Sequence, residues 1–198
     1  LLIKLDEVNN NINLFNTYIK DDIIVYLNRK KIYLKKDYNN WKNFYNFDND
    51  GKYKFEIIFN GIMTNMEKFF EECINIISID LSYFDNSDVT NISKMFNRCK
   101  RIKEIKGLDK FKTNKVEDMS ELFQFCCELE DLDLSNFDTS NVTSMQNMFS
   151  ECIKLKEIKG LKNFNTIKVN NMSMMFQLCS ELEIFDLSNF DTSNVNNL

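Results

Sequence analysis

Five cysteines recur along this chain at nearly constant spacing, and that repetition constrains the fold more than any other feature. The spacings are 26, 27, 26 and 27 residues, and a phenylalanine stands three positions before each cysteine. Chance does not produce five such coincidences, so much of the chain is a tandem repeat of short units. The five residues are Cys73, Cys99, Cys126, Cys152 and Cys179.

The units are of two alternating types, so the full period is a pair of units, 53 residues long. A short unit reads LEDLDLSNFDTSNVTSMQNMFSEC over residues 129–152, and the following long unit reads LKEIKGLKNFNTIKVNNMSMMFQLC over residues 155–179. The long units carry one extra residue, Gly107 or Gly160. A glycine inserted into a strand is typical of a β-bulge, and we predict a bulge at both positions.

Each unit combines two periodicities. Leu132 and Leu134 alternate as in a β-strand, whereas Val142, Met145 and Phe149 recur at steps of three and four, which predicts one face of a short helix. Residues 138–140 lie between these patterns and would cap the helix. Such units must stack to bury their apolar faces, so we expect an α/β solenoid with a parallel strand ladder and short helices opposite.

Residues 1–52 lack the repeat and read as a small β-rich N-terminal cap. Residues 23–34 predict a hairpin around a polar turn at 28–30. The array would then occupy residues 53–198, with five helix segments and an incomplete last unit. Since the chain begins at Leu1 and stops within a unit, we read it as part of a longer array. A separate ligand-binding module is the alternative interpretation of the N-terminal segment.

Residues 46–51 resemble half of a calcium-binding loop, but the position that should carry glutamate holds Ile57. We therefore interpret residues 46–51 as a polar turn.

The composition excludes several classes of function. The chain has no histidine, so it lacks the usual nucleophile–base pairs and the commonest zinc ligands. With four glycines it has no phosphate-binding glycine motif. A net charge of −5 argues against nucleic-acid binding. No segment is apolar enough to span a bilayer. We expect a monomer that is not an enzyme and holds no cofactor or metal.

The cysteines could form a metal site or disulfides, or they could remain unpaired. Only Cys126 and Cys127 are close in sequence, whereas zinc sites favour spaced pairs. Equivalent residues on stacked helices would be about 10 Å apart, beyond disulfide reach. We predict buried, unpaired thiols. The sequons at Asn91, Asn141 and Asn171 lie near the predicted helix starts, and helix capping is preferred there over glycosylation.

The segment LDLSNFDTSNVTSMQNMFSEC resembles the repeat of BspA-like leucine-rich-repeat surface proteins, also described as a mycoplasma-type lipoprotein repeat. The resemblance extends over roughly residues 55–198. It implies a right-handed, leucine-rich-repeat-like solenoid, placement at the cell surface or secretion, and adhesion or protein binding without catalytic residues. Unpaired cysteines and the absence of a visible signal are equally compatible with a cytoplasmic location.

Charges alternate along the predicted strand ladder. The column that runs from Asp80 to Asp186 carries opposite charges in successive units. The neighbouring column does the same, at Lys103, Glu130, Lys156 and Glu183. Equivalent positions in a parallel stack lie about 4.8 Å apart, so opposite charges would be neighbours. The alternation would fix the register of stacking, and it would also create a mixed-charge strip for a protein partner. The candidate binding residues are Asp80, Lys106, Asp133, Lys159 and Asp186.

The leading functional hypothesis is therefore a non-catalytic scaffold that binds a protein through its strand face. A structural spacer that presents another domain is the first alternative. The second is a repeat region whose longer protein has its activity elsewhere.

Overall fold

The computed structural model describes residues 2–6, 12–16, 23–37, 42–45, 53–59 and 61–197. Its strands fall into a six-stranded sheet of order β4-β3-β7-β1-β8-β9, a three-stranded sheet of order β2-β6-β5, and the pair β10-β11. The elements are β1 Leu2–Asp6, β2 Ile12–Asn16, β3 Ile23–Leu27, β4 Lys30–Ile32, β5 Lys35–Asp37, β6 Lys42–Tyr45, β7 Lys54–Phe59, β8 Ser78–Tyr83, β9 Glu104–Lys106, β10 Asp131–Asp133, β11 Glu157–Lys159 and the 3-10 helix η1 Leu161–Asn163.

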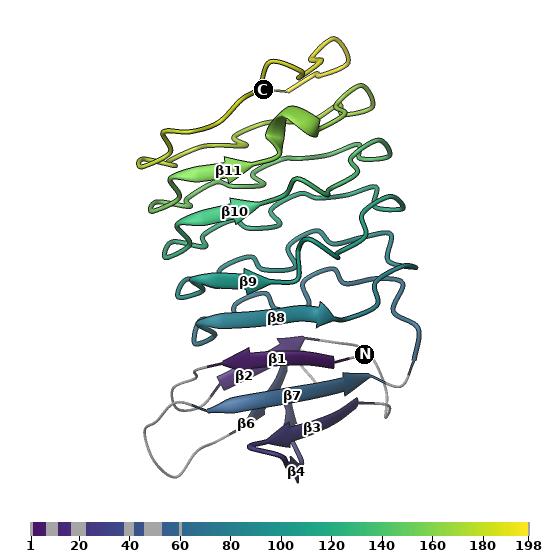
Figure 1. Ribbon diagram of the computed structural model, residues 1–198, viewed down its shortest axis with the longest axis vertical. Helices are drawn as coiled ribbons and strands as arrows, with labels where there is room; N and C mark the ends of the chain where they lie inside the picture. The colour runs from purple at the N-terminus through teal and green to yellow at the C-terminus, as the bar shows by residue number, and fades with distance from the viewer. Residues whose placement is uncertain are drawn as a thin grey trace.

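The N-terminal strands close one end of the repeats. Strand β1 runs antiparallel to both β7 and β8, and β8 is the first strand of the repeats (Figure 1). The predicted hairpin is confirmed, because β3 pairs with β4 across a turn in which Asn28 and Arg29 have positive φ. The boundary at residue 52 stays a prediction, and the suspected calcium loop lies outside the described residues.

Beyond β8 the units stack on one another (Figure 1). Strands β8 and β9 pair in parallel, as do β10 and β11. On another side of the units a column of parallel bridges joins each unit to the next, through Asn65, Asn91, Asp118, Ser144, Asn171 and Asn197. The repeat found in the sequence is therefore also a repeat in space.

The predicted right-handed α/β solenoid is wrong. The residues that the structure describes contain no α-helix, so the five predicted helix segments do not exist, and no helix there could cross a membrane. Their strands form three separate sheets in place of one parallel ladder.

Consecutive tight turns occupy each segment for which we predicted a helix. In residues 145–152 the amides of Met148, Ser150 and Cys152 donate to the carbonyls three positions earlier, over 3.1–3.2 Å. A turn of this kind brings residues three apart onto the same side. Core-facing side chains then recur at steps of three and four, as they do on a helix, and this shared spacing misled the prediction.

Left-handed residues prevent these turns from becoming a helix. Two residues in each segment have φ between 53° and 63°, for example Asn147 and Glu151. An α-helix needs φ near −63° at every position. Both residues stand third in a four-residue turn, where a type II turn requires positive φ. The same two positions are left-handed in all five segments, at Lys68, Glu72, Lys94, Arg98, Glu121, Phe125, Asn147, Glu151, Met174 and Leu178.

Every second amide of a turn segment donates to the next unit. In the fourth segment the amides of Met145, Asn147, Phe149 and Glu151 reach carbonyls of the following unit over 2.8–2.9 Å. The intervening amides close the turns described above. Backbone hydrogen bonding is thus divided between the unit itself and its successor, which satisfies polar groups that would otherwise be buried unpaired.

The predicted helix caps take other roles. The carboxylate of Asp138 accepts from the amide of Ser140 at 3.0 Å, and the Thr139 hydroxyl donates to the Asn165 carbonyl of the next unit at 3.0 Å. The sequon asparagines also form local or inter-unit bonds, for example from Asn141 Nδ2 to the Asn114 carbonyl at 2.8 Å.

A column of phenylalanines runs through the core, at the positions that precede the cysteines. Neighbouring rings stack with centroids 5.5–5.8 Å apart and planes within 11° of parallel. All but the last ring are buried. The predicted core role of these residues is confirmed, even though no helix carries them. The members are Phe70, Phe96, Phe123, Phe149 and Phe176.

The predicted β-bulges are also wrong. Gly107 and Gly160 follow directly after β9 and β11, whose pairing shows no shift in register. Their φ values are 85° and 90°, so each glycine begins a turn in the left-handed region. The extra residue of the long unit is accommodated where the strand ends and not within it.

Candidate interaction surface

Four of the five strand-face residues singled out in the sequence form two register pairs of opposite charge. Asp80 is the register partner of Lys106, and Asp133 is the register partner of Lys159. The side chains of Lys106, Asp133, Lys159 and Asp186 are exposed, and Asp80 is half-buried. Opposite charges therefore neighbour each other between β8 and β9 and between β10 and β11.

The aspartates of this face are fixed by the turns that follow them. The carboxylates of Asp80, Asp133 and Asp186 each accept from the amide of the serine two positions later, over 2.9–3.0 Å. Hydrogen bonds from the Ser135 side chain and then from its amide lower the pKa of the Asp133 carboxyl, and nearby Lys159 adds a smaller lowering effect. The Asp186 pKa is lowered in the same way by Ser188. Asp133 and Asp186 are thus held ionised in a fixed orientation.

The lysines pair along their own strands. Lys106 Nζ lies 3.3 Å from Glu104, and Lys159 Nζ lies 3.7 Å from Glu157. Both pairs are about half exposed, where an ion pair contributes about 0–1 kcal/mol. Asp80 and Asp133 are the register partners of these lysines, as predicted. The lysines nevertheless form their ion pairs with glutamates two residues away on the same strand.

The second predicted column does pair between units. Lys156 Nζ lies 2.7 Å from the carboxylate of Glu130. Their hydrogen bond lowers the pKa of Glu130 and raises that of Lys156. Lys154 and Glu128 form a similar pair at 2.9 Å. These contacts connect successive units on the surface, as expected of charges that set the stacking register.

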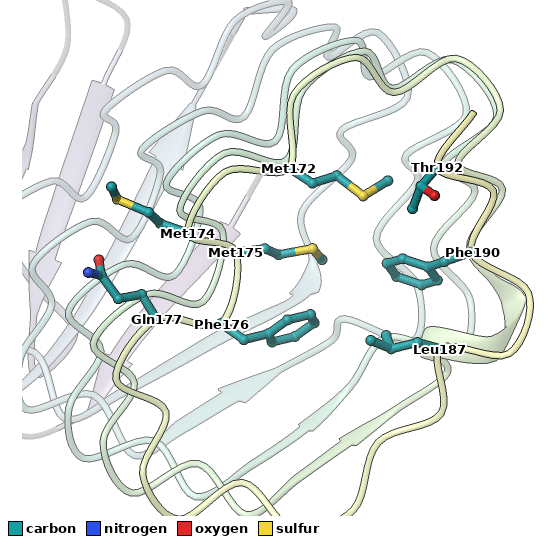
Figure 2. A pocket seen from close by; sticks show the side chains of 8 residues that line it. All are labelled: Met172, Met174, Met175, Phe176, Gln177, Leu187, Phe190 and Thr192. Atoms are coloured by element: carbon teal, nitrogen blue, oxygen red, sulfur yellow. The ribbon is translucent and has the colours of Figure 1, made fainter. Parts of the chain in front are cut away.

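Sequence reasoning missed an apolar groove at the C-terminal end of the stack. The groove encloses about 580 Å³ and is lined mainly by the turn segment of the fifth unit and the first half of the sixth. Met172, Met175 and Phe176 face Leu187 and Phe190 across it (Figure 2).

The cysteines form neither a disulfide nor, within the described residues, a metal site with nearby carboxylates. No disulfide joins the six cysteines, and within the described residues no group of three Cys, Asp or Glu is arranged to hold a metal. Cys73, Cys99, Cys126 and Cys152 are buried, whereas Cys127 and Cys179 are half-buried. Burial raises the pKa of Cys179 to about 11 and raises the pKa of Cys152 well above its usual value. The thiols of Cys152 and Cys179 are therefore protonated at neutral pH.

Comparison with known families places this repeat. The family described as "Mycoplasma protein of unknown function, DUF285" matches residues 64–160 and again residues 128–198. The two matches overlap and together span about two thirds of the chain. The chain belongs to the DUF285 family. The DUF285 match covers β8 to β11 and all five strand-face candidates, whereas β1 to β7 precede it.

No curated protein and no solved structure matches the chain. The description of the DUF285 family states no activity. Function must therefore be argued from the surfaces of the repeat itself.

Proposed function

We propose that this DUF285 chain is a non-catalytic scaffold that binds a protein partner through its strand face. The observation that carries the proposal is the register of exposed, oppositely charged side chains on that face, with Asp133 beside Lys159. Charges held in a fixed pattern favour one partner over others and steer its approach.

The strand-face lysines have few structural duties. The exposed pairs Lys106–Glu104 and Lys159–Glu157 add little stability. The units are instead held together by backbone hydrogen bonds and by the phenylalanine column. The lysine side chains can therefore turn to a partner at low cost to the fold.

The resemblance to BspA-like leucine-rich-repeat surface proteins supports the finer version of this proposal. In that version the DUF285 repeat acts in adhesion, at the cell surface or after secretion. The DUF285 match supports a relationship to mycoplasma repeat proteins. The location at the cell surface is part of our proposal.

Removal of two strand-face charges tests the proposal. A binder is first selected from an array of purified extracellular protein domains, and its Kd is then measured for each variant. We expect the double variant Lys106→Ala/Lys159→Ala to bind at least tenfold more weakly, about 1.4 kcal/mol.

The matched control is Lys110→Ala/Lys162→Ala, which removes the same charge from exposed lysines outside the strands. This control should change Kd less than twofold. If the strand-face variant binds as tightly as the wild type, the strand face is not the binding surface.

A structural spacer is the second candidate, and the continuous bonding between units favours it. Four amides of each complete turn segment reach the next unit, which makes the stack resistant to bending. If the chain is a spacer, none of the purified extracellular domains binds it in a manner that depends on Lys106 or Lys159.

A further inference from the structure

The loops that lead into β8, β9, β10 and β11 lie one above another along the stack (Figure 1). In the loop before β11, Lys154 Nζ lies 2.9 Å from the carboxylate of Glu128. Lys156 Nζ lies 2.7 Å from the carboxylate of Glu130. Both lysines therefore reach back to acids of the preceding unit, and this junction shows what cations at these two positions bind.

The equivalent cations in the loop before β9 lack such acids. Arg101 and Lys103 stand one period of 53 residues before the lysine pair. The unit that precedes them has Asn75 and Ile77 at the positions where the later unit has two glutamates. Within the described residues neither Arg101 nor Lys103 forms an ion pair.

The backbone is the same at both junctions, so the difference lies in the side chains. The amide of Lys103 donates to the carbonyl of Ile77 at 2.8 Å, and the amide of Lys156 donates to the carbonyl of Glu130 at 2.8 Å. Glu130 does not neutralise Lys103 in turn, because its carboxylate accepts from Lys156. Of the groups that lower the pKa of Glu130, Lys103 has the smallest effect.

Arg101 and Lys103 project into solvent together. Ile102 between them is buried, so the two flanking side chains point to the opposite side, and both are exposed. Lys100 beside them is also exposed, and Ile74 on the preceding unit is 48% exposed. The cations thus border a neutral and partly apolar surface.

We propose that Arg101 and Lys103 bind an acidic segment of a partner protein that carries two carboxylates two residues apart. An extended segment presents such carboxylates on one side, as the chain itself does with Glu128 and Glu130. The segment lies over Asn75 and Ile77, where the chain supplies no acid of its own. This site lies outside the strand face, so it can be present or absent whatever the strand face binds.

Other anionic occupants fit less well. The chain has a net charge of −5, which repels a long polyanion or an anionic membrane surface. A short acidic segment contacts only the local cations and avoids most of this repulsion. The pairs that Lys154 and Lys156 form also show that protein carboxylates suit these positions.

A short acidic peptide tests the inference. The probe is the end-blocked peptide ELEDL, copied from residues 128–132, and its control is QLQDL, which lacks the two glutamate charges. Each is titrated into the protein at low ionic strength, and the amide signals of Ile102 and Glu104 are followed by NMR. We expect ELEDL to bind about fivefold more tightly than QLQDL, a modest factor because exposed ion pairs are weak. Equal binding of the two peptides overturns the inference.

Removal of the two cations should have the same effect. In Arg101→Ala/Lys103→Ala the Kd for ELEDL should rise about fivefold. The matched control Lys110→Ala/Lys112→Ala removes two exposed charges from the same unit, and its Kd should change less than about twofold. Equal losses in the two variants would show only a general attraction by charge and would overturn the inference.

Restoring the missing acids should fill the site. In Asn75→Glu/Ile77→Glu the new carboxylates pair with the two cations, so ELEDL should bind as weakly as it does to the alanine variant. The control Asn75→Gln/Ile77→Gln adds similar side chains without charge and should bind ELEDL as the wild type does. Undiminished binding to the glutamate variant contradicts the inference.

Two further outcomes would assign the cations to another occupant and overturn the inference. One is binding of a sulfated polysaccharide, but not of ELEDL, that is lost in Arg101→Ala/Lys103→Ala. The other is a shift of the Ile102 and Glu104 signals with protein concentration alone, since a second copy of the chain would then be the occupant.

Discussion

At the scale of single residues, the alternation of long and short units reflects how each long unit packs against the short unit before it. A side chain at Gly107 would collide with the backbone of Leu81 and Ser82, and one at Gly160 would collide with Leu134 and Ser135. Each glycine of a long unit therefore lies against the Asp-Leu-Ser turn of the short unit before it. The period of two units follows from this fit.

Replacement of either glycine by alanine should strongly destabilise the fold. Gly107→Ala and Gly160→Ala each combine a left-handed backbone with a clash against backbone atoms that cannot move aside. We expect each variant to lose about 2 to 5 kcal/mol of unfolding free energy, measured by urea titration.

Gly61→Ala is the matched control. No atom lies within 4 Å of a Cβ placed at Gly61, and Gly61 does not have positive φ. Alanine there should change stability by less than about 1 kcal/mol, towards stabilisation, because the unfolded chain loses freedom. Equal losses at all three positions would contradict the proposed fit.

The buried cysteines predict a specific loss of stability at alkaline pH. Burial raises the pKa of Cys152 above that of the unfolded thiol, about 8.5. Above this pH the unfolded chain releases the proton and the folded chain keeps it, so stability falls as pH rises. At pH 9.5 one such thiol accounts for a loss of about 1.4 kcal/mol.

Urea titrations at pH 7.5 and 9.5 measure this effect. The wild type should lose more stability between the two values than Cys152→Ala, which has no thiol to ionise at that position. Identical losses in the two proteins would show that the Cys152 thiol is not shielded in the folded state.

At the scale of elements, the turn segment replaces the helix that the sequence pattern indicated. Its stability comes from the stacked phenylalanines and from bonds to the next unit, which offset the cost of two left-handed residues, about 1–2 kcal/mol each. The ring of Phe123 is buried between Phe96 and Phe149, whereas Phe176 is half-buried at the end of the column.

Loss of an interior ring should therefore cost more than loss of the terminal ring. We expect Phe123→Ala to lower the unfolding free energy by about 3–5 kcal/mol, and Phe176→Ala by less than half as much. Urea titration of both variants checks the ratio. A larger loss for Phe176→Ala would mean that the column does not end where the structure places it.

The sequence predicted burial more reliably than it predicted backbone geometry. Spacing alone identified Phe123, Phe149 and Cys152 as core, because inward-facing positions recur at three and four residues in both turns and helices. Spacing could not reveal left-handed φ at residues such as Glu121, since glutamate is not typical of that region. The register of Asp133 with Lys159 was predictable from charge alternation, but the hydrogen bond that the Ser135 amide donates to Asp133 was not.

At the scale of the whole molecule, the N-terminal strands extend the stack of repeats on the side of its first unit. The N-terminal strands continue the sheet through β1 and β8, so the first unit is not exposed. An apolar groove is lined by side chains from residues 172–177 and 187–192. The groove depends on how distant segments meet in space, which explains why no local pattern in the sequence predicted it.

The central claim is that each turn segment bonds to its successor and does not close on itself as a helix. NMR scalar couplings across hydrogen bonds measure this directly, because they identify the acceptor of each amide. We predict a coupling between the amide nitrogen of Phe96 and the carbonyl carbon of Leu122, whose oxygen lies 3.0 Å from that nitrogen. A coupling from Phe96 to the Ile92 carbonyl, as in an α-helix, would contradict the account.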